Sequence, residues 1–184
     1  TDFLIIFVLF FMSITPYLLV QKSTDIFFIS DADDNHLVGR TITISSGFTV
    51  GDVLTLTTQN GISGNFDSLT GVLTISGTAS LANYETALRS ITYNSTSEDP
   101  TITSGNRTII WIVTDADSDE AGAEISISVV STISITPLND LPVVTAGGTL
   151  NYTENGSAEV VDNSITISDT DDIELTGASV AISD

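Results

Sequence analysis

The stretch ISDADDNHLVGRTITIS, residues 29–45, places crowded acidic side chains directly before a run in which apolar and polar residues alternate. A second stretch, ISDTDDIELTGASVAIS at residues 167–183, is identical to it at 9 of 17 positions, with an offset of 138 residues. Self-similarity of this kind indicates an internal duplication. The second copy stops before the part that would correspond to residues 47–137 of the first copy, so we expect one full repeat and the start of another.

Alternation with a period of two continues through the first copy and predicts half-buried β-strands. The runs are RTITIS (40–45), DVLTLTT (52–58), GVLTISG (71–77), SITYN (90–94), RTIIWIVTD (107–115) and EISISVVSTISIT (124–136). Turn-forming residues separate them, as in QNGISGNFDSLTG (59–71), whereas ASLANYETALRS (79–90) breaks the alternation and predicts a helical turn. Many short strands joined by turns predict an all-β fold, an antiparallel β-sandwich.

The chain divides into three segments. Residues 1–25 include the apolar run FLIIFVLFFM (3–12), for which we expect an ordered segment buried in an assembly, an uncleaved signal or a membrane anchor. Membrane contact is expected only if residues 3–20 are such an anchor, and the first copy is expected to lack a normal opening strand. Pro137 and Pro142 bracket a stiff connector, because proline cannot donate to a sheet ladder. Residues 26–138 are thus predicted to form the complete sandwich, and residues 139–184 the incomplete second repeat.

The charge excludes whole classes of partner. Asp and Glu number 24 against 4 Lys and Arg, a formal net charge of -20, which repels nucleic acid phosphates and anionic membrane surfaces. Cations are therefore the expected ligands, and no nucleic acid partner is expected. Cysteine is absent, which removes disulfides, thiolate metal sites and cysteine nucleophiles together.

Ten of the 24 acidic residues gather in three short clusters instead of coating the surface evenly. The clusters are Asp31, Asp33 and Asp34; Asp115, Asp117, Asp119 and Glu120; and Asp169, Asp171 and Asp172. Carboxylates at this density repel one another unless a counterion binds, and oxygen ligands crowded into loops suit Ca²⁺. The alternative is an acidic, salt-adapted surface, which would not need clustering. DADDN and DADSDE resemble the start of an EF-hand loop, but they lack the glycine and glutamate that this loop requires.

Several stretches together resemble the cadherin-like tandem repeats of large bacterial surface proteins and adhesins. They are TGVLTISGTASLANYETALRSITY (70–93), IVTDADSDE (112–120), LNDLPVV (138–144), TENG (153–156) and ISDTDD (167–172). The resemblance covers about residues 26–184. It implies a Greek-key β-sandwich of the cadherin and immunoglobulin kind, with Ca²⁺ bound where consecutive domains meet.

The resemblance also implies a role for individual residues. The junction between the two copies would be built by Glu85, Asn139, Asp140, Asp169 and Asp171. Asp31 and Asp33, with Asp115 beside them, would serve the opposite end of the first repeat, and Glu154 would face the next junction. The linker departs from the family pattern at Pro137 and Leu141, so fewer or weaker ions are expected than in a full junction.

These observations predict a non-enzymatic, extracellular or cell-surface module, structural or adhesive, that is stiffened by Ca²⁺. Its expected partners are neighbouring repeats or identical subunits, with a cell-surface or glycan ligand as a further candidate. One alternative is a self-assembling filament subunit that exchanges strands between neighbours. Another is the carbohydrate-binding module of a secreted enzyme, using Trp111, Tyr84 or Tyr93, although their strand and turn patterns favour packing in the core. The single histidine, His36, lies in an acidic loop, and nothing marks a nucleophile elbow.

Overall fold

A computed structural model describes residues 19–23, 26–117, 120 and 122–183. The predictions for residues 1–18 and for Asp119 lie outside these described residues. Within them, no helix has the length and hydrophobicity needed to cross a membrane.

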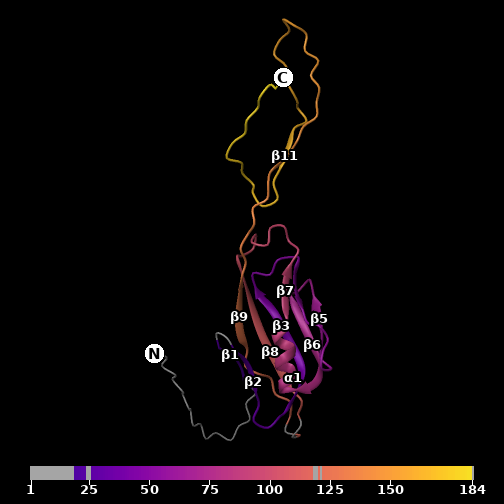
Figure 1. The fold of residues 1–184 in the computed structure, drawn as a ribbon, viewed down its shortest axis with the longest axis vertical. Helices are drawn as coiled ribbons and strands as arrows, with labels where there is room; N and C mark the ends of the chain where they lie inside the picture. Colours follow the sequence, from indigo (N-terminus) through magenta and orange to yellow (C-terminus); the bar gives the residue numbers. More distant parts are fainter. Residues whose placement is uncertain (1–18, 24–25, 118–119, 121, 184) are drawn as a thin grey trace, which may run out of the picture.

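The main layer is a five-stranded antiparallel sheet with the strand order β5-β6-β3-β8-β9 (Figure 1). The strands are β3 (His36–Ser46), β5 (Ser63–Asp67), β6 (Val72–Ser80), β8 (Asn106–Asp115) and β9 (Val129–Ser134). Strand β3 lies at the centre, paired with β6 on one side and β8 on the other. The alternation predicted for β3 is confirmed, because Leu37, Ile42 and Ile44 are buried against the core.

A second layer covers the inner face of this sheet. It contains the strand pair β4 (Asp52–Thr55) and β7 (Thr92–Ser95), together with the helix α1 (Leu81–Arg89). Leu54 from β4 and Leu88 from α1 join Leu73 and Ile109 of the large sheet in one hydrophobic core. Because β3 and β4 follow each other in sequence but lie in different layers, the chain crosses from one layer to the other between them. The predicted all-β antiparallel sandwich is confirmed.

The predicted helical turn is the helix α1. Its N-cap is Ser80, whose side chain accepts a hydrogen bond from the Asn83 N–H, a favourable arrangement because the first N–H groups of a helix have no partner within it. Tyr84 is fully buried, and its hydroxyl donates to the Gly77 carbonyl at 2.5 Å. Burial raises the pKa of Tyr84 to about 12. This side chain packs in the core, as its pattern favours, and does not lie on a surface where it could contact a sugar.

Two elements differ from the sequence prediction. Strand β5 falls inside the stretch that we interpret as turns, and it forms because it pairs with β6 along its whole length. An opening hairpin also precedes β3: β1 (Leu19–Ser23) pairs with β2 (Ile26–Ser30), with β1 in contact with β9 and β2 in contact with α1. The expectation that the first copy lacks an opening strand is therefore wrong, and this hairpin crosses the boundary predicted at residue 25.

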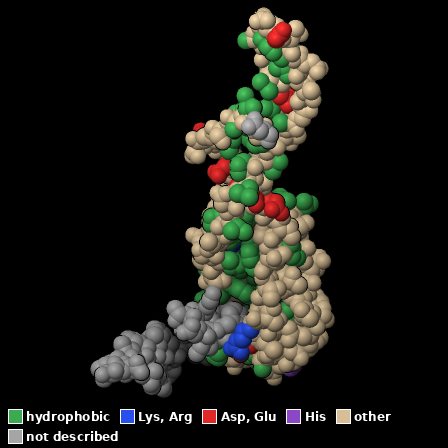
Figure 2. All heavy atoms as spheres, turned by 45° about the horizontal axis from the view of Figure 1, so that its top comes forward, with side chains coloured by type: hydrophobic (Ala, Val, Ile, Leu, Met, Phe, Trp, Pro, Cys, Tyr) green, Lys and Arg blue, Asp and Glu red, His purple; other side chains and the backbone are tan. Residues whose placement is uncertain are grey.

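The C-terminal part extends away from the sandwich along the long axis of the molecule (Figure 1). Its strands, β10 (Val143–Thr145) and β11 (Thr166–Ser168), form a two-stranded sheet, and hydrophobic side chains lie along its surface (Figure 2). Leu175, Val180 and Ile182 correspond by the duplication to Leu37, Ile42 and Ile44, yet they are 46%, 99% and 101% exposed. Among the described residues, the stretch 175–182 forms no strand.

Candidate metal centre

The register of the sheet determines which acidic loops share an end of the sandwich. At one end, His36 lies opposite Ser80, which caps α1, and Leu37 lies opposite Asp115. We call this the α1 end. At the other end, Asn106 at the start of β8 lies opposite Ser134 at the end of β9. The linker leaves the sandwich there, so we call it the linker end.

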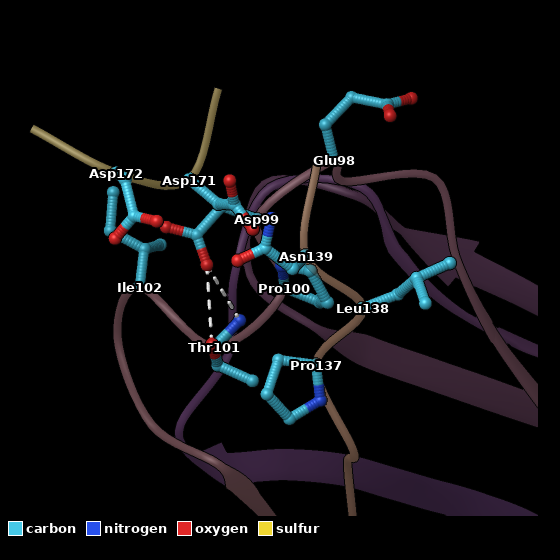
Figure 3. A pocket seen from close by; sticks show the side chains of 10 residues that line it. All are labelled: Glu98, Asp99, Pro100, Thr101, Ile102, Pro137, Leu138, Asn139, Asp171 and Asp172. Atoms are coloured by element: carbon cyan, nitrogen blue, oxygen red, sulfur yellow. Dashed lines mark hydrogen bonds between the residues drawn. The ribbon is translucent and has the colours of Figure 1, made fainter. Parts of the chain in front are cut away.

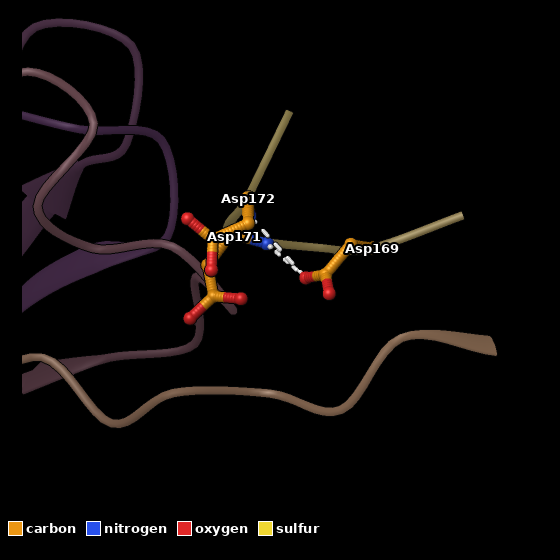
Figure 4. Close-up of side chains that lie close together, drawn as sticks. All are labelled: Asp169, Asp171 and Asp172. Carbon is orange, nitrogen blue, oxygen red and sulfur yellow. Dashed lines mark hydrogen bonds between the residues drawn. The ribbon is translucent and has the colours of Figure 1, made fainter. Parts of the chain in front are cut away.

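Three carboxylates converge at the linker end (Figure 4). Asp169, Asp171 and Asp172 each place one oxygen within 4.8 Å of the others, and they are the one such group of three among the described residues. Asp169 Oδ1 accepts hydrogen bonds from the N–H groups of Asp171 at 3.3 Å and of Asp172 at 3.2 Å. Asp171 Oδ2 accepts from the Asp140 N–H at 3.1 Å, which ties this loop to the linker.

The other oxygen of Asp171, Oδ1, is buried and has no hydrogen-bond partner in the described structure. A buried carboxylate oxygen without a donor is costly, because it has lost water and gained nothing in return. The hydrogen bond from the Asp140 N–H lowers the pKa of Asp171, but partial desolvation and the neighbouring Asp169 raise it on balance. A cation at this place would favour the charged carboxylate and so lower the pKa of Asp171.

A pocket of about 450 Å³ adjoins these carboxylates (Figure 3). Its walls are the loop 98–102 between β7 and β8, the linker residues Pro137, Leu138 and Asn139, and Asp171 and Asp172. Glu98 and Asp99 therefore lie at the same site, although the sequence analysis did not single them out. The signal was present: SEDP (97–100) lies between two strands, at the end of the sheet from which the linker leaves.

A second acidic group lies at the α1 end. Asp34 and Asp115 are buried, with exposed fractions of 6% and 3%, and Asp31 Oδ2 is a buried oxygen with no hydrogen-bond partner among the described atoms. Burial raises the pKa of Asp115, and the charges of Asp34 and Asp31 raise it further, although the N–H groups of Glu124 and Asp117 donate to this carboxylate. The sequence-predicted proximity of Asp31 and Asp115 is thus present in the structure.

The structure places Glu85 at the other end of the sandwich from the predicted one. The resemblance implies that it belongs to the linker junction, but Glu85 lies on α1, and its Oε1 accepts a hydrogen bond from the Ile29 N–H at 2.9 Å. Its Oε2 forms an ion pair with Arg89 at 3.2 Å, one turn further along the helix. Glu85 therefore lies at the α1 end, because α1 follows directly from the end of β6.

The remaining predicted ligands are dispersed. Asp33 is exposed at the α1 end. Asp117 follows Asp115 there, and its Oδ1 accepts from the Gly122 N–H at 2.7 Å. Glu154 is exposed in a turn of the C-terminal part. The side-chain amide of Asn139 donates to the Asp140 carbonyl.

The ligand chemistry at the linker end fits a hard dication. Every charged group that lines the pocket is a carboxylate, and Ca²⁺ takes six to eight oxygen ligands from carboxylates, carbonyls, amides and water. The buried, unsatisfied Asp171 oxygen is the type of atom that such an ion would complete.

The fold and these loops define an all-β sandwich with carboxylate groups at both ends. In an alignment over 71 positions that covers 35% of this chain, the chain is 41% identical to halomucin, a large surface protein of the archaeon Haloquadratum walsbyi. The chain spans only 1% of the length of halomucin. No protein-family model matches the sequence, and no solved structure matches it. The similarity suggests a repeat of an extracellular or cell-surface protein, and the cadherin-like resemblance stays a prediction.

Proposed function

We propose that this chain is a non-enzymatic structural repeat of an extracellular surface protein, and that Ca²⁺ bound at the linker end stiffens the joint between the sandwich and the C-terminal part. The observation that carries the proposal is the buried, unpartnered Oδ1 of Asp171 within a group of three carboxylates. The similarity to part of halomucin supports the surface location. Adhesion to a cell-surface or glycan ligand is an extension of the same proposal.

Residues from both sides of the joint would hold the ion. Asp169, Asp171 and Asp172 would supply carboxylates from the C-terminal part, and Asp99 would supply one from the sandwich. A bound Ca²⁺ would offset two of these negative charges and link the two sides. The joint would then lose freedom of rotation, because ligands on both sides share one ion.

The test is calcium titration of the whole chain by isothermal titration calorimetry, with thermal unfolding in Ca²⁺ and in chelator. At a calcium concentration 100-fold above Kd, the ion stabilises the folded state by about 2.7 kcal/mol. We expect Asp171→Asn to remove the tightest binding component, because it replaces a carboxylate oxygen at the centre of the group. Glu159→Gln is the matched control, since it removes one exposed negative charge of the C-terminal part outside this group.

Two results would contradict this proposal. One is a wild-type chain that binds no Ca²⁺, with identical melting curves in Ca²⁺ and in chelator. The other is stabilisation by NaCl at equal ionic strength that matches the effect of Ca²⁺, which would favour the salt-adapted surface. Screening acts on all exposed charges alike, whereas a site distinguishes Asp171→Asn from Glu159→Gln.

A filament subunit is the second candidate function. The observation that favours it is the exposure of Leu175, Val180 and Ile182, whose counterparts in β3 are buried. A neighbouring molecule that supplied strands to this segment would bury these side chains, as in β-strand addition.

A further inference from the structure

Arg107 is the largest fully buried side chain among the described residues, with an exposed fraction of 0%. Its Nε donates to Asp52 Oδ2 at 2.5 Å, and its Nη2 lies 3.3 Å from Asp52 Oδ1. Asp52 also accepts hydrogen bonds from the Tyr93 hydroxyl at 2.7 Å and from the Thr49 N–H at 2.9 Å. The guanidinium is therefore held in one orientation by a carboxylate that is itself held from two further sides.

The rest of the guanidinium reaches the loop between β7 and β8. Nη1 donates to the Ser104 carbonyl at 2.7 Å, and Nη2 donates to the Pro100 carbonyl at 2.5 Å. These two carbonyls belong to the loop whose residues 98–102 line the pocket at the linker end. The buried guanidinium of Arg107 thus ties the loop to the sandwich at two points, Pro100, which directly follows Asp99, and Ser104.

We propose that Arg107, oriented by Asp52 and Tyr93, is a positioning residue for the cation site at the linker end. It fixes the loop so that Asp99 is held at the pocket beside Asp171 and Asp172 before an ion arrives (Figure 3). This inference rests on the proposed function, because it concerns the affinity of that site. Without the clamp, the loop would have to be ordered when the ion binds, and the entropy cost would weaken binding.

The expected effect is a loss of calcium affinity without the loss of a ligand. Groups that orient metal ligands typically cost about 10–100-fold in metal affinity when they are removed. Arg107→Lys keeps the positive charge but cannot reach both carbonyls and Asp52 with one ammonium, so we expect a loss in this range. Tyr93→Phe removes only the hydrogen bond to Asp52, so we expect a loss of affinity that is smaller than that of Arg107→Lys but more than twofold.

The experiment compares these variants with Tyr84→Phe by calorimetric titration with CaCl₂. Tyr84→Phe also removes one hydroxyl, the one that donates to Gly77. Tyr84 lies on α1, at the end of the sandwich opposite the cation site. We expect Tyr84→Phe to keep the wild-type Kd even where its melting temperature falls as far as that of Tyr93→Phe. The Kd that is compared between variants belongs to the binding component that Asp171→Asn abolishes. Hydrogen exchange of the amides in residues 101–104, measured in chelator, is expected to accelerate in Tyr93→Phe and not in Tyr84→Phe.

The outcomes separate the two proposals. A wild-type chain that binds no Ca²⁺ overturns the proposed function and this inference with it. A wild-type chain that binds Ca²⁺, with Kd unchanged within twofold in Tyr93→Phe and in Arg107→Lys, overturns the clamp alone. If Arg107→Lys does not fold, Tyr93→Phe decides: an unchanged Kd and unchanged exchange of the loop amides contradict the clamp, and a weaker Kd with faster exchange supports it.

Discussion

At the scale of single residues, Asp52 and Arg107 form a buried ion pair inside the sandwich. Neither side chain of this ion pair has exposed surface. Without favourable contacts to its partners, each buried ion would cost the fold roughly several kcal/mol of desolvation free energy. Burial alone would raise the pKa of Asp52, but hydrogen bonds from Arg107, Tyr93 and Thr49 outweigh it and lower this pKa below its usual range. The charged carboxylate is therefore the form that the fold stabilises.

The pair predicts a pH-dependent stability difference. Removing one partner of a buried pair costs about 3–5 kcal/mol, so we expect Asp52→Asn to lose about this much of the free energy of unfolding at pH 7. A lowered folded-state pKa gives stability that is present above the unfolded value and is lost as the pH falls through the folded value. The difference between wild type and Asp52→Asn should therefore shrink below about pH 4.

Urea unfolding at pH 7, 5 and 3 measures this difference. Asp67→Asn is the comparison, because Asp67 is exposed and its pKa is also lowered by hydrogen bonds, from the Leu69 N–H and the Thr70 hydroxyl. We expect a much smaller loss there at pH 7. An Asp52→Asn variant that loses the same stability at all three pH values would contradict the assignment.

The sequence identified acidic clusters at this scale but not their arrangement. Three carboxylates within four consecutive positions, as in Asp169, Asp171 and Asp172, converge because a tight turn brings them together, and that is visible in the sequence. Arg107 and Asp52 are 55 positions apart, and only the completed fold brings them together. Glu85 was assigned to the wrong end for the same reason, since the order of motifs does not say where β6 ends.

At the scale of elements, one glycine of strand β3 is packed differently from its counterpart in the second copy. Gly39 has φ of +122°, beside a register shift in its pairing with β6, and a Cβ built there would lie 2.1 Å from the Ile75 carbonyl oxygen. Its counterpart in the second copy, Gly177, has no atom within 4 Å of such a Cβ. The same sequence position is thus closely packed in one copy and open in the other.

We expect Gly39→Ala to destabilise the sandwich by at least ~2 kcal/mol, because the new methyl group meets backbone and the positive φ is strained. Gly177→Ala should change stability by less than ~0.5 kcal/mol. Chemical denaturation followed by the fluorescence of Trp111 reports on the sandwich in both variants. Equal effects would contradict the register of β3 against β6.

The elements themselves were largely predictable, and β5 is one of the two exceptions. Strands β3, β6 and β8 alternate because one face meets the core, and α1 lacks this alternation. Strand β5 has the sequence SGNFD, which has turn-forming composition and one large apolar residue, Phe66. It is a strand because β6 offers it an edge, and a Cβ at Gly64 would already lie 3.0 Å from Leu56 and Leu73. Pairing of this kind is a tertiary effect that local composition does not encode.

At the scale of the whole molecule, the two parts of the chain differ in how they are held together. The sandwich has one continuous core with residues from both layers, whereas the C-terminal part has two strands of three residues each and exposes most of its apolar side chains. Regions with few buried contacts open at low free energy, so the C-terminal part should unfold locally while the sandwich stays closed. Acidic side chains lie at the narrow region between the two parts (Figure 2), where the proposed ion would act.

Limited proteolysis with thermolysin, which cleaves beside large apolar residues, tests this difference. We expect cleavage within residues 143–182 long before any cleavage within β3 or β8, because cleavage follows the population of open states. Calcium should slow cleavage near Leu138 and Leu141 in the wild type, but not in Asp171→Asn, since only the joint is fixed by the ion.

Light scattering of the same samples separates the filament alternative: strand exchange would give large particles whose C-terminal segments resist the protease. A monomeric chain with a rapidly cleaved C-terminal part would contradict the filament, and a monomer that resists cleavage at Val160, Val180 and Ile182 in chelator would contradict the local-opening argument.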